Sequence, residues 1–409
     1  MLVNHREQIV WFSLSVSRGF IKQRSSATSR NRSPGTLWSR VPPLSAEMDE
    51  RLRTSVSRKI ALFKRASNHN SQNGGSIGEW HALSHPMDEN STSRIASVYL
   101  AFAEHEAHGR SALYETFARG VAADRVALSF LSEFPRAKQQ PNLLFAAIKY
   151  LYGTPRDWSN FQRLLLEHGD DIRATMMART TQTNEPARCA TLLPLLARLP
   201  PPLALLEVGA AAGLCLLPDL YAFDYDGHRV QPTSVTPAAA PTFFCRANRA
   251  PLPNRGLETI WRAGLDLRPI DINDAEQVAW LEALVWPDEG NRLQLLRTAL
   301  EVANHCRPRV VQGDLRTDLR ALAAQMPENA TRVIFHTAVL GYLNSPSERS
   351  AFAQDLNDLD VVWICNESPE LFPDVTQGLS KPWPLRLFLL SMNRRPVAWT
   401  DPQGLVSIG

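Results

Sequence analysis

An acidic residue followed by a turn of small residues is the stretch of this sequence with the clearest potential for chemistry. Glu207, Gly209, Ala211 and Gly213 alternate with other small or apolar residues, directly after the apolar run Leu203–Leu206. A short apolar run preceded by prolines is typical of a buried parallel strand. Residues without bulk then allow backbone N–H groups to approach an anionic or polar ligand. We therefore predict a strand and a ligand-binding turn, followed by a short helix to about residue 220.

Polar side chains end or follow each of the later segments that we predict to be strands. The segments are 259–266, 309–312, 332–336 and 361–365, and the side chains are Asp266, Asp314, His336 with Thr337, and Asn366 with Glu367. Helical patterns separate these segments, which predicts an open α/β sheet of parallel strands. Because ligands bind outside the carboxyl ends of the strands in such sheets, we expect these side chains to surround one crevice beside the small-residue turn.

The residues before the first strand predict a helix that begins near this crevice. Asn184 is a suitable N-cap, and Pro186 suits the first turn of a helix that runs to about residue 198. Asn184, Glu185 and Arg188 are expected to cap and anchor this helix. Because the helix leads directly into the first strand, the same three residues are candidates for lining a pocket, together with Thr337.

Three motifs, taken in order, resemble those of class I S-adenosylmethionine-dependent methyltransferases. They are Glu207-x-Gly209-x-Ala211-x-Gly213, Gly264-Leu265-Asp266 and Gly313-Asp314. The resemblance implies that Glu207 and the turn approach the methionine part of the cofactor, that Asp266 binds the ribose hydroxyls, and that Asp314 lies beside the adenine amine. It also implies a Rossmann-like three-layer α/β sandwich ending in a C-terminal antiparallel hairpin, which we place at 385–400.

Methyl transfer from S-adenosylmethionine to a small molecule is the function that this resemblance implies. The protein must align donor and nucleophile, and must remove a proton if the nucleophile carries one. His336 is the candidate base, because histidine titrates near neutral pH. Two alternatives stay open. One is a non-catalytic protein on the same scaffold that binds a nucleoside-like ligand or a partner, and the other is a Rossmann-type enzyme that uses a nicotinamide or a sugar nucleotide.

Each site residue also has a purely structural interpretation. Asp266 could cap the turn after its strand, and Asp314 could cap the following helix. His336 could be a hydrogen-bonded residue at a strand end. Trp280, Trp286 and Trp363 lie in apolar patterns and are predicted to belong to the core.

The sequence departs from the methyltransferase pattern in two places. Ala211 replaces the middle glycine of the turn, so we expect its φ to be negative. The span between the turn and Asp266 is long, which predicts an insertion at about 222–258 with a hairpin at Asp226-Gly227. If Asp266 is not the second acid of the pattern, Asp224 and Asp226 are the alternatives.

Residues from about 94 to the end also resemble a bacterial family of unknown function, number 2332. The resemblance rests on Thr183-Asn184-Glu185, Leu206-Glu207-Val208-Gly209-Ala210-Ala211-Ala212-Gly213-Leu214, Trp261-Arg262-Ala263-Gly264-Leu265-Asp266-Leu267, Val285-Trp286-Pro287-Asp288 and Phe335-His336-Thr337-Ala338-Val339-Leu340. These motifs are long and specific, but the family supplies no established activity.

Charge and composition divide the chain into three parts. Residues 1–95 carry 14 Lys and Arg against 7 Asp and Glu, and the rest carries 30 against 34, so the net charge of +3 conceals a mildly acidic main part. We predict a disordered basic extension at 1–94, a helical N-terminal layer at 95–200 and a Rossmann-like domain at 201–409. Two alternatives for the extension stay open: an organelle transit peptide, or a start codon assigned too early, with Met48 or Met87 as the true start. The acidic balance of the main part argues against a nucleic-acid partner.

Cysteines and apolar runs indicate the environment of the chain. The 5 cysteines are scattered without a C-x-x-C pair, which predicts reduced, mostly packed thiols in a cytoplasmic protein. No apolar run approaches the roughly 18 residues that span a bilayer, so no membrane association is expected. No ligand spacing predicts a metal site. The sequence indicates no particular oligomeric state.

Overall fold

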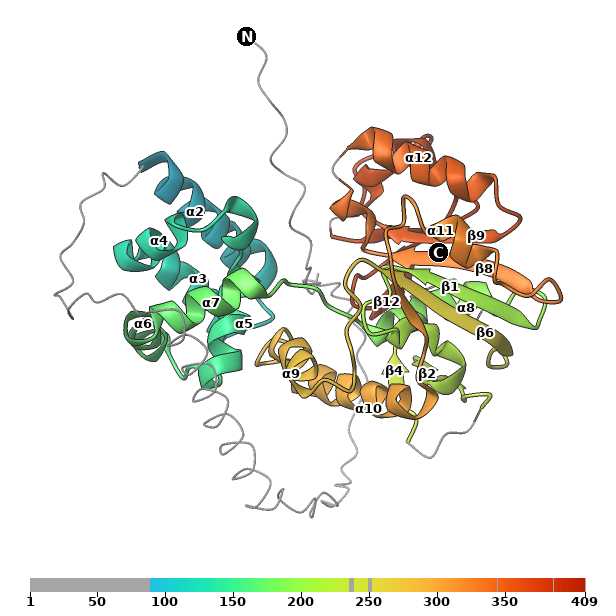
Figure 1. The fold of residues 1–409 in the computed structure, drawn as a ribbon, viewed down its shortest axis with the longest axis horizontal. Coiled ribbons are helices and arrows are strands. Elements are labelled where there is room, and N and C mark those ends of the chain that lie inside the picture. The colour runs from blue at the N-terminus through green and yellow to red at the C-terminus, as the bar shows by residue number, and fades with distance from the viewer. Residues whose placement is uncertain (1–88, 235–238, 249–251, 344, 385, 409) are drawn as a thin grey trace, which may run out of the picture. The chain divides into compact units, whose positions relative to one another are not determined.

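The computed structural model describes residues 89–409 except for 235–238, 249–251, 344, 385 and 409 (Figure 1). The predicted disordered extension at 1–94 lies outside the described residues up to position 88. Its last residues belong to the first described helix, α2 (Glu89–Phe102). No helix in the described part of the chain is long and apolar enough to cross a membrane.

A nine-stranded sheet forms the centre of the α/β part (Figure 1). From one edge to the other its strands are β5 (Arg246–Asn248), β12 (Val406–Ile408), β11 (Arg395–Thr400), β10 (Phe388–Met392), β9 (Val362–Glu367), β8 (Thr331–Thr337), β1 (Leu203–Val208), β6 (Thr259–Asp266) and β7 (Val310–Gln312). The adjacent strands β7, β6, β1, β8 and β9 are parallel, which confirms the predicted open α/β sheet. Numbered along the chain, these five lie in the order 3-2-1-4-5, which is that of a doubly wound sheet. The order reverses between β1 and β8, where such sheets bind their ligands.

Antiparallel strands extend the sheet beyond β9. Strand β10 pairs with β9, and β11 pairs with β10, both antiparallel, which confirms the predicted terminal hairpin. Strand β12 continues this pattern, and β5 then pairs with β12 in parallel and ends the sheet. The sequence does not predict β12, because its 3 residues are too few to establish a period of two.

Helices cover both faces of the sheet. Leu203 and Leu205 of β1 pack into one core with α8 and α10, whereas Ala204 and Leu206 pack into a second core with α11 and α12. A parallel strand that is covered on both faces needs a continuous apolar run, and β1 supplies one. The helices are α8 (Cys189–Leu196), α10 (Gly290–Cys306), α11 (Leu319–Ala323) and α12 (Pro346–Asn357).

The cysteines agree with the predicted packed thiols. All five are free, and all except Cys306 are buried. Two of them, Cys189 and Cys215, lie in the core beside β1, where Cys215 Sγ approaches the carbonyl oxygen of Glu185 at 3.3 Å. The thiols therefore fill the core as small apolar groups.

The helices that precede the sheet form a layer with its own aromatic core. Phe117, Phe145 and Phe161 lie at its centre, and Trp280 and Trp286 of the α/β part pack into the same core, which confirms their predicted burial. The layer consists of α2, the π-helical turn η1 (Ala103–Ala107), α3 (Ala112–Ala123), α4 (Arg125–Ser132), α5 (Pro141–Tyr152), α6 (Trp158–Glu167) and α7 (Gly169–Ala178).

Polar contacts join this layer to the end of helix α9 (Ala275–Ala283). Trp286 Nε1 donates to Asn142 Oδ1 at 3.0 Å, and Lys149 Nζ donates to the carbonyl oxygen of Val285 at 2.5 Å. Burial lowers the pKa of Lys149 to about 8. The lysine lies beyond the carboxyl end of α9, where a cation is favourable for the helix dipole.

An insertion separates β1 from β6. It contains a three-stranded sheet of β2 (Ala222–Tyr225), β3 (His228–Val230) and β4 (Thr242–Phe244). Strands β2 and β3 form the predicted hairpin, and Asp226 and Gly227 adopt the positive φ values of 52° and 98° that tight hairpin turns require.

The segment after the small-residue turn is helical to Leu220, as predicted, but it is not one continuous helix. Two 3₁₀ helices, η4 (Leu214–Leu216) and η5 (Pro218–Leu220), occupy the segment. Pro218 has no N–H to donate within a helix. All side chains from Leu214 to Leu220 are buried, so the segment has no polar face of the kind that an amphipathic helix exposes.

The turns after β1 and β8 touch each other at Gly209. Its φ is +74°, and a Cβ atom at this position would lie 2.2 Å from Val339 Cγ2. Gly109 has nearly the same φ, +77°, but a Cβ atom there would meet nothing within 4 Å. Comparing alanine variants at the two glycines therefore separates the cost of a left-handed backbone, which both variants carry, from the cost of close packing, which only one carries.

We predict that Gly209→Ala destabilises the full chain more than Gly109→Ala does. A side chain in a left-handed backbone costs about 1–2 kcal/mol of stability in both variants. Overpacking against Val339 costs about 1–3 kcal/mol more in Gly209→Ala alone. Urea unfolding measures both free energies. Equal losses in the two variants would contradict the close approach of the two turns.

Candidate functional site

The turn after β1 contains three residues with positive φ. Gly209 and Gly213 both have φ +74°, and Ala211 has φ +50°. The prediction that Ala211 keeps a negative φ is therefore wrong. Two hydrogen bonds hold this residue in place: its N–H donates to Asp266 Oδ2 at 2.8 Å, and its carbonyl oxygen accepts from the N–H of Ile270 at 3.0 Å. They offset a strain of about 1–2 kcal/mol, and non-glycine residues held in this way cluster at functional sites.

Asp266 fixes the turn from the end of β6. Besides Ala211, it accepts hydrogen bonds at Oδ1 from the N–H of Arg268 at 2.8 Å and from Gln182 Nε2 at 3.1 Å. The bond to Arg268 is the turn-capping role that the sequence also allowed. The alternative acids lie elsewhere: Asp224 and Asp226 belong to the β2–β3 hairpin of the insertion.

Glu207 is the unusual group of the site. It lies at the carboxyl end of β1 with 2% of its surface exposed, and its Oε2 has no hydrogen-bond partner among the described residues. Burial, followed by the proximity of Cys215, raises the pKa of Glu207 well above its ordinary value, while the charge of Arg188 opposes the shift. An unsatisfied buried polar atom is costly and needs an explanation. Seven other buried side-chain atoms of the described residues also lack a partner, among them Asn366 Nδ2 at the end of β9.

Residues 182–188, which we call the covering segment, lie over the turn. Gln182 reaches Asp266, and Asn184 Oδ1 accepts the N–H of Leu214 at 2.9 Å. The prediction that Asn184 caps its own helix is therefore wrong. Glu185 performs that role, because its Oε1 accepts the N–H of Ala187 at 3.2 Å at the start of the 3₁₀ helix η3 (Pro186–Arg188).

Arg188 connects the covering segment to two other turns. Its Nη1 donates to the carbonyl oxygen and to Oγ1 of Thr337, at 3.3 and 3.2 Å, and its Nε donates to the carbonyl oxygen of Pro402 at 2.8 Å. Within the described part of the chain, no carboxylate forms an ion pair with this guanidinium. The predicted pocket residues Arg188 and Thr337 are thus in direct contact, and a positive charge lies at the end of β8.

His336 is completely buried, and both ring nitrogens are engaged. Its Nδ1 lies 2.8 Å from Glu367 Oε1, and its Nε2 accepts a hydrogen bond from Trp363 Nε1 at 3.0 Å. Because Nε2 accepts, the proton lies on Nδ1 and is donated to Glu367. Glu367 also accepts the N–H of Val339 at 2.9 Å. This is the geometry of a hydrogen-bonded strand end, and it leaves no nitrogen for the base role predicted from the sequence.

Asp314 is turned toward a local ion pair. Its Oδ2 lies 2.5 Å from Arg316 Nη2, and its Oδ1 accepts the N–H of Arg316. The hydrogen bond from the Arg316 side chain lowers the pKa of Asp314. The preceding residue, Gly313, is the one that contacts β6, because its N–H donates to the carbonyl oxygen of Asp266 at 2.9 Å.

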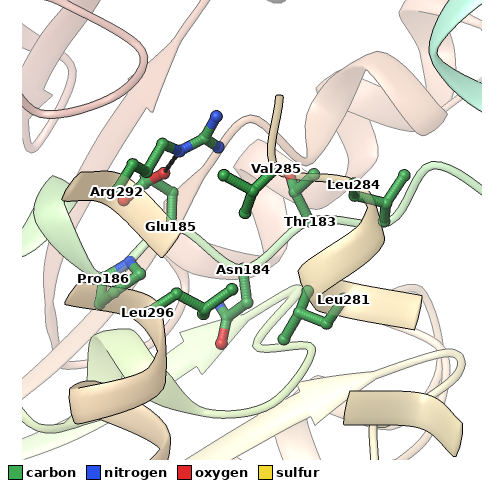
Figure 2. Close-up of a pocket in the computed structure, with 9 residues that line it drawn as sticks. All are labelled: Thr183, Asn184, Glu185, Pro186, Leu281, Leu284, Val285, Arg292 and Leu296. Carbon is green, nitrogen blue, oxygen red and sulfur yellow. Dashed lines mark hydrogen bonds and ion pairs between the residues drawn. The ribbon is translucent and has the colours of Figure 1, made fainter. Parts of the chain in front are cut away.

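A cavity lies between the covering segment and helices α9 and α10 (Figure 2). Its empty volume is about 260 Å³, part of which is open solvent, so it is smaller than an ordinary substrate pocket. Glu185 Oε2 accepts from Arg292 Nε at 2.5 Å on one side of the cavity. The lining residues are Thr183, Asn184, Glu185, Pro186, Leu281, Leu284, Val285, Arg292 and Leu296.

Gln182, Arg292 and Trp363 contact the predicted site residues but were not themselves predicted as site residues. The sequence predicts Trp363 only as a core residue, and its burial confirms this. Gln182 precedes a family motif and is the only one of the three that a local signal could have indicated. Arg292 and Trp363 are recognisable only when α10 and β9 lie beside the site. No group of three or more His, Cys, Asp and Glu side chains in the described ranges is arranged to hold a metal ion.

We predict that Glu207→Gln removes a pH dependence from folding. The folded chain keeps the Glu207 proton at pH values where the unfolded chain has released it, so the free energy of unfolding falls as the pH rises above about 4.5. The stability difference between the variant and the natural chain should grow in favour of the variant as the pH rises, with a slope that approaches about 1.4 kcal/mol per pH unit while the folded chain keeps the proton.

The measurement is urea unfolding of the full chain across this pH range. Glu301→Gln, at an exposed position of α10, is the control and should give a difference that is independent of pH. A constant difference for Glu207→Gln as well would show that this carboxyl titrates normally.

A family model matches residues 96–381 of the chain and describes an uncharacterized protein conserved in bacteria, DUF2332. The match covers more than half of the sequence, so the chain belongs to this family. No curated protein and no solved structure matches the chain. The function therefore has to be argued from the site.

Proposed function

We propose that this member of the bacterial family DUF2332 binds S-adenosylmethionine at the carboxyl ends of β6, β1 and β8 and transfers the methyl group to a small molecule. The observation that carries the proposal is the buried carboxyl of Glu207, with one oxygen unpartnered, directly before the left-handed turn. This residue occupies the acidic position of the methyltransferase motif. The strand order supports a Rossmann-like three-layer sandwich of the class I methyltransferase type.

The methionine end of the cofactor has charges that suit the residues around the turn. It carries an ammonium group, which would satisfy the free Oε2 of Glu207, and a carboxylate, which would pair with the guanidinium of Arg188. Glu207 and Arg188 are close enough that the charge of the arginine lowers the pKa of the carboxyl against the effect of burial. An α-amino-acid group likewise presents one positive and one negative charge.

The nucleoside end would lie toward β6. Asp266 ends this strand, and the ribose hydroxyls would donate to its Oδ1 in place of Gln182, leaving the bond from Oδ2 to Ala211 intact. The adenine role that the resemblance implies for Asp314 would require its ion pair with Arg316 to open. We therefore leave Asp314 out of the proposed set of binding residues.

The bound cofactor would supply an electrophilic methyl group on a sulfonium. The chain would hold that group by its charged end, exclude water with the covering segment, and orient the acceptor. His336 serves in this proposal as a positioning residue, since its contact with Glu367 supports the backbone of Val339. We therefore expect an acceptor whose nucleophilic atom needs no histidine base, such as a thiolate or a neutral amine.

The internal hydrogen bonds of Asp266 and His336 favour a second candidate function. These side chains are satisfied without a ligand, as expected of a non-catalytic protein that binds a nucleoside-like ligand on the same scaffold. This candidate predicts cofactor binding without methyl transfer. For either candidate we propose a cytoplasmic protein that acts on a small molecule rather than on nucleic acid, given the acidic balance of residues 96–409.

We predict that the full chain binds S-adenosylmethionine and S-adenosylhomocysteine in calorimetric titrations at neutral pH. On binding, the Glu207 carboxyl would lose its proton and pair as a carboxylate with the ammonium group, whereas the variant Glu207→Gln offers only a neutral amide oxygen, so both affinities should fall by about 10- to 100-fold. Glu301→Gln should leave both affinities unchanged. Binding that is absent or only millimolar in the natural chain would overturn the proposed function.

A further inference from the structure

Tyr342 is a large aromatic residue left open to solvent beside the site. It ends the 3₁₀ helix η6 (Leu340–Tyr342), which follows β8, and 71% of its surface is exposed. Its neighbours Leu340 and Leu343 are both buried. The chain therefore anchors this short helix through the two leucines and leaves the tyrosine ring outside the core.

The backbone around Tyr342 is held firmly against the small-residue turn. Ala338 has φ +58°, and its N–H donates to the carbonyl oxygen of Asn366 at 3.1 Å. Val339 donates its N–H to Glu367, contacts Gly209, and accepts the N–H of Tyr342 at 3.0 Å. The strained alanine and these bonds fix the position of the backbone that carries the ring. Strain of this kind is typical of functional sites.

The charges near Tyr342 favour a cation on its ring. Burial raises the pKa of the Tyr342 hydroxyl, and the charged groups that act on it besides burial are Arg188, Asp266 and Glu367, two carboxylates against one guanidinium. Glu207, buried nearby at the end of β1, would add a negative charge when ionised. The face of an aromatic ring attracts cations. Among the described residues, the arginine and lysine contacts with ring faces involve other rings, so this face is not taken by the chain itself.

The order of the strands indicates which part of a bound ligand would contact the ring of Tyr342. Strands β6 and β8 lie on opposite sides of β1. Asp266, at the end of β6, would take the ribose, so the opposite end of the ligand lies toward β8 and Tyr342. In S-adenosylmethionine that end carries the sulfonium and the amino-acid group.

We propose that the ring of Tyr342 covers the positively charged sulfonium and thereby selects S-adenosylmethionine over its neutral thioether product. This inference rests on the proposed function and extends it to the discrimination between donor and product. Loss of the charge after methyl transfer removes the attraction to the ring, which favours release of S-adenosylhomocysteine.

The test is calorimetric titration of the full chain, and of its Tyr342→Phe and Tyr342→Leu variants, with S-adenosylmethionine and with S-adenosylhomocysteine. The phenylalanine keeps the ring, and the leucine keeps apolar bulk without it. We expect the preference for S-adenosylmethionine to fall by about 3- to 30-fold in Tyr342→Leu, the range of cation–π contacts, and to persist in Tyr342→Phe. Because the side chain is exposed, both variants should unfold at the same temperature as the natural chain.

The other outcomes are distinct from one another. Equal weakening of both ligands in Tyr342→Leu would mean that the ring touches a part that they share, which overturns the inference and leaves the proposed function intact. Unchanged binding of both ligands would have the same consequence. Failure of the natural chain to bind either ligand would overturn the proposed function and the inference together.

Discussion

The burial of the Glu207 carboxyl at the centre of the sheet is the constraint around which the site is organised. A carboxyl group loses most of its hydration there, and one of its oxygens finds no partner. The fold tolerates this cost because β1 is held on both sides by β6 and β8, so that the strand end cannot move to water. A ligand that brings a donor to this oxygen would recover part of the cost, which gives binding a specific energetic reason.

The surrounding contacts join three chain segments into one unit. Asp266 holds the left-handed turn after β1, the covering segment holds Asp266 and Leu214, and Arg188 holds the turn after β8. Each bond links residues from different elements, so the site can form only when the sheet is complete. Most of these contacts are in place without a ligand, so the site is largely pre-organised, apart from the bond from Gln182 to Asp266 that a ribose would replace.

Patterns that depend on neighbours in sequence could be predicted, and contacts between distant residues could not. The apolar run of β1 and the β2–β3 hairpin are local signals, and both occur. By contrast, the positive φ of Ala211 is held by a hydrogen bond to Asp266, which lies 55 positions along the chain. Asn184 accepts its hydrogen bond from Leu214, 30 positions along the chain. The burial of His336 likewise depends on Trp363 and Glu367, 27 and 31 positions along the chain. Such partners are chosen by the topology of the sheet and leave no trace in local spacing.

The central claim is that Glu207 is buried to receive the charged end of a nucleoside-type ligand. A crystal structure of the full chain grown with S-adenosylhomocysteine tests it most directly. Our account predicts the ammonium group of the ligand within hydrogen-bond distance of Glu207 Oε2, with the ribose at Asp266. A ligand bound elsewhere, or a Glu207 carboxyl paired only with protein groups in a crevice filled by side chains, would contradict it.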